Sequence, residues 1–175
     1  MGTLVKARCN DCQASYNYVF GVPNDLRPFR VFLMLFIRSQ KNLFVWDNFV
    51  SVMNSELELD INFQLKSDQE KNEILNQNFK SVQAFFSDEE KKALTTNILM
   101  KAELNSYPVF KVNDDPKYRQ IFNVPLLRFD FIDGSSYQRK YGKHVYYVQV
   151  SEDQRYLTCP RCNRLSAGYL SETEV

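Results

Sequence analysis

The chain has 175 residues, a mass of 20.6 kDa and a formal net charge of +1, and 44% of its residues are hydrophobic. This composition suits one globular domain, or one domain with a small metal-binding module, and excludes a disordered chain. Glycine occurs only 5 times without forming a phosphate-binding loop, and the longest apolar run, residues 31–37, is too short to cross a bilayer, so we expect a soluble intracellular protein of the cytoplasm or nucleus.

The first fifty residues predict two strands followed by two helices. Residues 3–8 and 14–20 flank the first pair of cysteines, and the second of these segments alternates aromatic and smaller side chains, as a strand does. Residues 29–37 are apolar nearly all round, which predicts a buried helix and leaves a buried strand as the alternative. Residues 44–53 repeat apolar side chains at helical spacing, so we expect a second helix packed on the first.

Residues 57–65 give the clearest strand pattern in the chain. Every odd position is apolar and every even position is polar, which predicts one buried and one solvated face. Glu58 and Asp60 share the polar face. We interpret them as solvated side chains of a sheet and not as ligands.

Two matched helix starts follow. Ser67 and Ser87 each precede a glutamate by three residues, as in the capping box, in which each side chain bonds the backbone of the other residue. These helices are expected to form an antiparallel hairpin with an acidic outer surface. Beyond them, residues 108–112, 126–132 and 144–150 predict strands.

A loop that interleaves aromatic and basic side chains separates the last two of these strands. Asp133-Gly134, a strong turn dipeptide, begins it. Aromatic faces can stack on bases while cations neutralise phosphates, as on surfaces that bind single-stranded nucleic acid, although such loops also occur without a ligand. The candidate nucleic-acid contacts in this loop are Tyr137, Arg139, Lys140, Tyr141 and Lys143.

The four cysteines form two C-x-x-C pairs near opposite ends of the chain, Cys9 with Cys12 and Cys159 with Cys162. Two residues between thiolates let one tight turn aim both sulfurs at one ion, and two such turns complete the tetrahedral shell that Zn²⁺ prefers. One structural zinc ion would therefore join the two ends of the chain across the 146 residues from 13 to 158.

Other uses of the cysteines fit less well. Two disulfides would need an oxidising compartment, and a thioredoxin-like motif would need one pair between a strand and a helix. A full shell of four thiolates leaves no open position for catalysis by zinc. Redox-active iron takes the same four ligands and stays open as an alternative.

The second pair, Cys159-Pro160-Arg161-Cys162 with Asn163 behind it, resembles the C-P-x-C-(G/N) knuckle of zinc ribbons and rubredoxins. The proline stiffens the turn, and the asparagine tolerates the left-handed backbone that such a turn needs. The resemblance covers the two ends and implies a zinc ribbon, which would be split between residues 1–22 and 146–175. Together with the helices and strands predicted between them, it leads us to expect an α+β fold. Residues 23–145 would then be an inserted unit of helices and antiparallel sheet.

Positive charge gathers near the two chain ends. Residues 1–41 and 136–164 each carry a net charge of +4, whereas residues 42–135 carry −5. A shared zinc ion would concentrate this charge in a footprint that suits phosphates, and Arg161 and Arg164 would project from a rigid turn. We therefore expect a non-catalytic zinc-binding accessory protein that binds RNA, single-stranded DNA, or a ribonucleoprotein or transcription complex.

Two other functions stay open. One is a protein-interaction module, for example a small viral or regulatory inhibitor that docks on a larger machine. The other is a carboxylate-dependent nuclease that would use Asp60 with Lys66, or Asp130 with Lys140. His144 is the only histidine, which excludes zinc proteases and nucleases with paired histidines, so we expect no enzyme.

Overall fold

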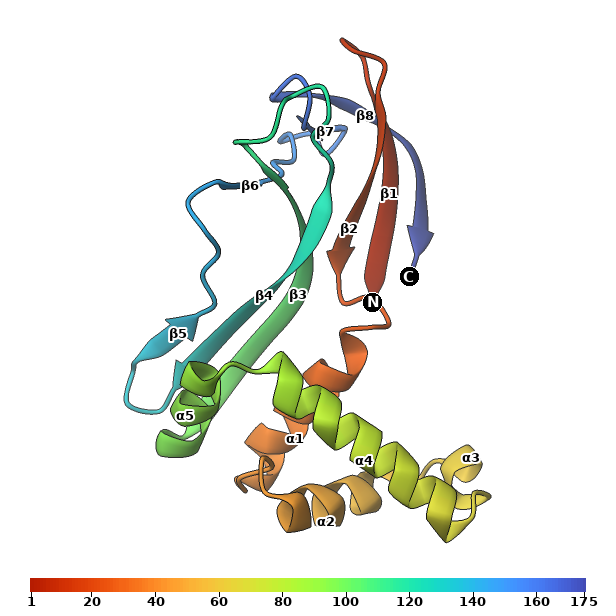
Figure 1. Cartoon of the computed structure of the whole chain (residues 1–175), viewed down its shortest axis with the longest axis vertical. Helices are drawn as coiled ribbons and strands as arrows, with labels where there is room; N and C mark the ends of the chain where they lie inside the picture. Colours follow the sequence, from red (N-terminus) through yellow and green to blue (C-terminus); the bar gives the residue numbers. More distant parts are fainter. The chain divides into compact units, whose positions relative to one another are not determined.

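The computed structural model describes all 175 residues and combines helices with antiparallel strands (Figure 1). Helices take 32% and strands 34% of the chain, so the predicted α+β class is confirmed. No helix combines the length and apolar character that crossing a bilayer requires. In chain order the elements are β1 (Gly2–Cys9), β2 (Ser15–Gly21), α1 (Arg27–Ser39), α2 (Trp46–Leu57), α3 (Ile61–Gln64), α4 (Asp68–Phe85), α5 (Asp88–Thr96), β3 (Leu99–Lys111), β4 (Phe122–Phe131), β5 (Ser136–Gln138), β6 (Val145–Tyr147), β7 (Tyr156–Cys159) and β8 (Arg164–Glu174).

The chain divides into two compact units. The barrel unit consists of residues 1–27, 103–128 and 138–175, and the helical unit of residues 28–102 and 129–137. The strand order is β5-β4-β3-β2-β1-β8-β7, with β6 beside β3. The division into a split ribbon and an insert stays a prediction.

Strand pairing closes a circuit within the barrel unit. β1 pairs with β2 on one side and with β8 on the other, and β8 pairs with β7. β2 meets β3 at Gly21 and Ser106, and β3 pairs with β6. The chain beyond β6 reaches β7 through a bridge between Val150 and Leu157, so these strands form a small antiparallel barrel with a shared interior.

The interior of the barrel includes two of the cysteines. Along β1, Val5, Ala7 and Cys9 are buried and alternate with exposed Lys6 and Arg8, which is the period-two pattern of a strand with one face in a core. The two strands predicted around the first cysteine pair are therefore confirmed. The buried cluster consists of Val5, Ala7, Cys9, Tyr18, Phe110, Val148, Leu157, Cys159 and Ala167.

The two ends of the chain lie side by side because β1 and β8 are neighbours. Thr3 is directly opposite Glu174, and the backbone N–H of Val175 donates to the carbonyl oxygen of Gly2 at 2.9 Å. A Cβ atom at position 2 would lie 2.5 Å from the Pro23 backbone and 2.7 Å from the Val175 carbonyl oxygen. Only glycine therefore fits at position 2.

The first two predicted helices are present in the helical unit. On α1, Phe32 packs in a cluster of phenylalanine rings, with ring centroids 5.3 Å from Phe44 and 5.5 Å from Phe86. Trp46 and Phe49 of α2 each lie 5.2 Å from Phe79 of α4. The helices of this unit are therefore held together by aromatic packing.

The strand predicted for residues 57–65 is wrong. α2 extends to Leu57, and Asp60 caps the short helix α3 by accepting hydrogen bonds from the N–H groups of Asn62 and Phe63. Alternation shows which side chains could share a face, but a strand also needs a paired neighbour, and this stretch has none. Phe63 is buried, whereas three other apolar side chains are largely exposed, Leu59 at 88%, Ile61 at 75% and Leu65 at 81%.

Both predicted capping boxes are confirmed. Ser67 accepts the N–H of Glu70 at 3.3 Å and donates its own N–H to the Glu70 carboxylate at 2.8 Å. Ser87 and Glu90 repeat the arrangement at the start of α5, at 3.2 and 2.9 Å. Glu70 is exposed, whereas Glu90 is fully buried.

The later strands are longer or shorter than predicted. β3 begins at Leu99 and β4 at Phe122, because polar residues hide the first part of each strand in the sequence pattern. The predicted turn at Asp133-Gly134 is present, with Gly134 at φ +82° and the Phe131 N–H donating to Ser135 at 2.9 Å. β5 follows this turn, inside the stretch that was predicted to be a loop.

Candidate metal centre

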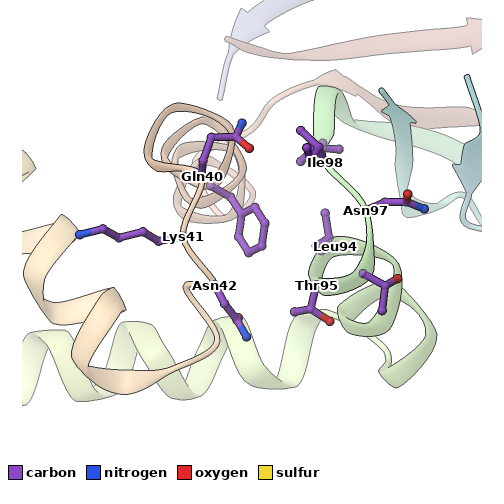
Figure 2. Close-up of a pocket in the computed structure, with 10 residues that line it drawn as sticks. Gln40, Lys41, Asn42, Leu94, Thr95, Asn97 and Ile98 are labelled. Atoms are coloured by element: carbon purple, nitrogen blue, oxygen red, sulfur yellow. The ribbon is translucent and has the colours of Figure 1, made fainter. Parts of the chain in front are cut away.

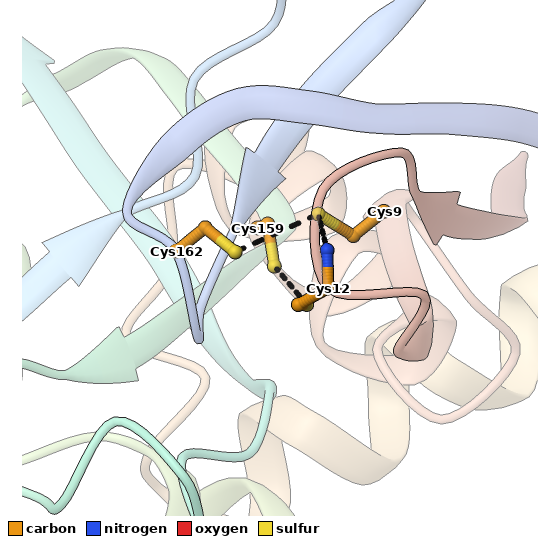
Figure 3. Close-up of side chains that lie close together, drawn as sticks. All are labelled: Cys9, Cys12, Cys159 and Cys162. Carbon is orange, nitrogen blue, oxygen red and sulfur yellow. Dashed lines mark hydrogen bonds between the residues drawn. The ribbon is translucent and has the colours of Figure 1, made fainter.

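The four cysteines lie together at one end of the barrel. Cys9 and Cys12 belong to the turn between β1 and β2, and Cys159 and Cys162 to the turn between β7 and β8. Because β1 pairs with β8, the two turns face each other, and all four sulfur atoms lie within 4.8 Å of one another (Figure 3). The predicted ligand set therefore forms a possible metal site.

Two of the sulfur–sulfur distances match those expected around one tetrahedral ion. The Sγ atoms of Cys9 and Cys162 are 3.8 Å apart, and those of Cys12 and Cys159 are 3.7 Å apart. Four thiolates at about 2.3 Å from a central ion occupy the corners of a tetrahedron with edges of about 3.8 Å. A disulfide would need about 2.0 Å, so these cysteines are free thiols, close enough together that they could hold one ion.

The two turns repeat one backbone hydrogen bond. Gln13 and Asn163, each following the second cysteine of its pair, have positive φ angles of 61° and 53°. Their N–H groups donate to the carbonyl oxygens of Cys9 and Cys159 at 3.0 and 2.8 Å. The left-handed backbone predicted at Asn163 is confirmed, and the same conformation at Gln13 was not foreseen.

Ser166 on β8 holds the first turn in place. Its hydroxyl lies 3.1 Å from the Cys9 sulfur, and its carbonyl oxygen accepts the N–H of Asn10 at 2.8 Å. The N–H of Cys12 also points at the Cys9 sulfur, at 3.5 Å. Such hydrogen bonds favour the thiolate form that a metal requires.

Arg119 braces the second turn. Its guanidinium donates to the carbonyl oxygen of Pro160 at 3.2 Å, and also to those of Val112 at 2.7 Å and Asp114 at 3.0 Å. The same group lies 5.7 Å from the centre of the Phe110 ring. This planar fork fixes the knuckle relative to the end of β3, and nothing in the cysteine spacing indicates it.

The cysteine thiols differ in how readily they lose a proton. Burial alone would raise the pKa of Cys9, but hydrogen bonds from the Cys12 N–H, the Ser166 hydroxyl and neighbouring groups lower it to about 6. Burial, assisted by the neighbouring sulfurs, raises the pKa of Cys162 to about 11, and burial raises that of Cys159 further. One thiolate forms readily, whereas several side by side require a cation.

Two of the predicted nucleic-acid contacts lie beside the cysteine site. Arg161 is inside the second turn and Arg164 opens β8, and both side chains are exposed. Of the other candidates, Tyr137 lies in β5, and the remaining four lie between β5 and β6, where Lys140 and Lys143 are exposed and Arg139 is partly buried.

The two tyrosines of that loop use their hydroxyls within the protein. Tyr137 donates to the Glu90 carboxylate at 3.0 Å and stacks on Phe129 with ring centroids 5.6 Å apart. Burial and the Glu90 charge raise the pKa of Tyr137 to about 12. Tyr141 donates to the carbonyl oxygen of Pro125. Both rings are partly buried, so little of either face is free for stacking on a base.

The helical unit has a cavity of about 240 Å³ between the end of α1 and the end of α5 (Figure 2). Its polar rim closes helix ends: Gln40 donates to the Ile37 carbonyl at 2.7 Å, and the Thr95 hydroxyl donates to the Lys91 carbonyl at 2.8 Å. Lys41 points away from the other residues drawn. These two side chains are committed to the backbone of their own helices.

Comparison of the chain with protein-family models, curated proteins and solved structures finds no match. The most specific arrangement that its residues form is the cluster of four thiols, whose donor set matches soft, thiophilic metal ions.

Proposed function

We propose that Cys9, Cys12, Cys159 and Cys162 bind one structural Zn²⁺ ion, and that the two turns with their paired strands form a zinc ribbon assembled from both chain ends. The two sulfur–sulfur separations of 3.7 and 3.8 Å across the site support the proposal most directly. Bound zinc would neutralise the thiolates and tie the turns together without an open position for substrate. The role of the ion is therefore stability.

Metal analysis of the purified protein tests the zinc assignment. We expect one zinc per chain, and loss of most of it in Cys12→Ser, whose hydroxyl is a poor ligand for this ion. Ser15→Ala, an exposed change beside the same turn, should keep the metal. Iron as the bound metal, with a visible absorption that bleaches on reduction, would support the rubredoxin-type alternative and contradict the zinc assignment.

We further infer that the barrel unit binds nucleic acid through its phosphates. This unit has 13 basic and 9 acidic residues, a net charge of +4, whereas the helical unit has 9 basic and 12 acidic residues, a net charge of −3. Arg161 and Arg164 are exposed on a turn that the site and Arg119 hold rigid, so they lose little freedom on contacting phosphate. Lys140 and Lys143 add exposed charge to the same unit.

Binding of the zinc-loaded protein to labelled single-stranded RNA, single-stranded DNA and duplex across a salt series tests this proposal. The logarithm of affinity should fall linearly with the logarithm of salt concentration, and Arg161→Ala or Arg164→Ala should each reduce the slope by about 1. Lys80→Ala, an exposed change on α4, should leave the slope unchanged. No binding at low salt would contradict the proposal and favour the protein-interaction alternative.

A further inference from the structure

A hollow of about 490 Å³ opens on the barrel unit. Phe20 of β2 and Tyr169 of β8 line it, together with four residues of the segment that leads into β7. Tyr169 is 37% exposed, so its ring is accessible to a ligand. These four residues are Val150, which bridges to Leu157, and Ser151, Glu152 and Gln154 of the turn that follows.

A β-bulge brings a carboxylate to the face of the sheet that carries Tyr169. Tyr169 lies opposite Ala7, and Glu172 opposite Val5, with a register shift between these pairs that leaves Leu170 unpaired. In a regular strand, residues three positions apart point to opposite faces of the sheet. The extra residue in the bulge shifts this alternation by one position, so both side chains point to the same face. Glu172 and Tyr169 therefore share a face. Burial is the main cause that raises the pKa of Tyr169, and the charge of Glu172 is the second cause.

The turn that carries Glu152 is rigid. The hydroxyl of Ser151 lies 2.6 Å from the Asp153 carboxylate and accepts the N–H groups of Arg155 and Tyr156 at 3.2 and 3.0 Å. The Glu152 side chain itself makes no hydrogen bond or ion pair within the chain. A free carboxylate on a preorganised turn thus lines the hollow, and binding would cost little ordering of the backbone.

Fixed aromatic rings continue inward from Phe20. The ring of Tyr107 meets that of Phe20 edge-on, with centroids 5.4 Å apart, and its hydroxyl donates to the Val148 carbonyl at 2.8 Å. Aromatic faces beside carboxylates attract organic cations and repel anions such as phosphate. The hollow therefore suits a guanidinium or ammonium group.

The outer edge of β8 is open beside this hollow. β7 pairs with β8 as far as Gly168, and the Tyr169 N–H still donates to the carbonyl oxygen of Arg155 at 3.3 Å. Beyond the bulge, residues 171–174 pair only with β1. An extended segment can add to such an edge by backbone hydrogen bonds while one side chain enters a pocket. Glu172 and Glu174 lie on this stretch, so their charge favours a basic segment.

We propose that the hollow binds the arginine or lysine side chain of a basic segment of a partner protein, which adds as a strand to the outer edge of β8. This site does not depend on the proposed binding of nucleic acid. It uses different residues and the opposite charge.

Nuclear magnetic resonance titration of the zinc-loaded, isotope-labelled protein tests the proposal. The probes are three capped pentapeptides, Thr-Val-Arg-Val-Thr and its lysine and glutamine counterparts. The arginine or lysine peptide should shift the amide signals of residues 150–154 and 169–174 in a saturable way, and comparing the two identifies the preferred cation. Equal binding of the glutamine peptide, no saturable shifts, or shifts only elsewhere would overturn the proposal.

Single substitutions distinguish specific binding at the cation site from non-specific binding of the peptides. Glu152→Gln and Tyr169→Ala should each weaken the cationic peptides about fivefold, the effect of one modest cation contact. Tyr169→Phe, which keeps the ring, and Asp11→Asn, an exposed change in the first turn, should bind as the unaltered protein does. Unchanged affinity in the folded Glu152→Gln variant would contradict the role of the carboxylate.

Discussion

Tyr18 shows how single buried contacts hold the cysteine site. The residue is fully buried in the barrel, and its hydroxyl donates to the carbonyl oxygen of Thr158 at 3.1 Å, one residue before Cys159. Burial also raises its pKa, so the hydroxyl keeps its proton at all working pH values. The contact connects β2 to the strand that leads into the second turn.

Removing that hydroxyl should weaken the barrel. We expect Tyr18→Phe to lower the free energy of unfolding by about 1–2 kcal/mol, because a buried carbonyl loses its partner. Tyr16→Phe, on the same strand with a partly exposed ring, is the matched control and should change it by less than about 0.5 kcal/mol. Denaturant unfolding of the zinc-loaded protein measures both, and equal effects would contradict this role of the Tyr18 hydroxyl.

Arg119 leads to a second prediction at this scale. Arg119→Lys keeps the charge but loses the planar fork, so we expect a loss of about 2 kcal/mol in stability and faster removal of metal by a chelator. Arg155→Lys, at an exposed pair with Asp153, should change stability by less than about 0.5 kcal/mol. If Arg119→Lys matched Arg155→Lys in both measurements, the bracing role would be wrong.

The four cysteines could be predicted as one set of candidate ligands because metal binding favours the spacing within each pair. Ser166 and Arg119 could not, since they act through positions that only the fold creates. Tyr137 shows the reverse difficulty. Its place in a basic loop predicted a free aromatic face, but its hydroxyl is committed to Glu90 and its ring to Phe129.

At the scale of elements, residues 57–65 distinguish the two interpretations of one sequence pattern. A strand with one buried face would make Leu59 and Phe63 equally important, whereas the structure buries only Phe63, at 6% exposure. We expect Phe63→Ala to cost about 3 kcal/mol and Leu59→Ser less than about 0.5 kcal/mol. Unfolding experiments on both variants decide this, and similar costs would restore the strand.

Helix starts were the most predictable elements. The capping boxes at Ser67 and Ser87 are local, because all their hydrogen bonds lie within four residues. The burial of Glu90 was beyond such patterns, since the two boxes have the same motif and differ only in what packs above them. The first part of β3 was missed because polar residues hide its pattern, and β5 was missed because it has only three residues.

At the scale of the whole molecule, the cysteine spacing predicted that the two chain ends lie together. Nothing in the sequence predicted that the strands close into a barrel. The bridge between Val150 and Leu157 and the single meeting of Gly21 with Ser106 are pairings that no local pattern encodes. A metal ion across these ends closes a long loop, so its removal should destabilise the barrel unit strongly.

Metal binding should depend on pH in a defined direction. Without metal, the raised pKa values keep Cys159 and Cys162 protonated at pH 7, whereas Cys9, at about 6, is largely a thiolate. Zinc must displace the protons, so we expect release of about two protons or more per ion at pH 7 and weaker binding as the pH falls. Zinc titration in weak buffer with a pH indicator measures this, and no proton release would contradict the thiolate site.

The most direct test of the four-thiolate zinc site is X-ray absorption at the zinc edge of the metal-loaded protein. We expect a single shell of four sulfur atoms at about 2.3 Å from the metal. A shell with nitrogen or oxygen atoms, or with fewer than four sulfurs, would show that the two cysteine turns do not share one ion, and would contradict the site at its centre.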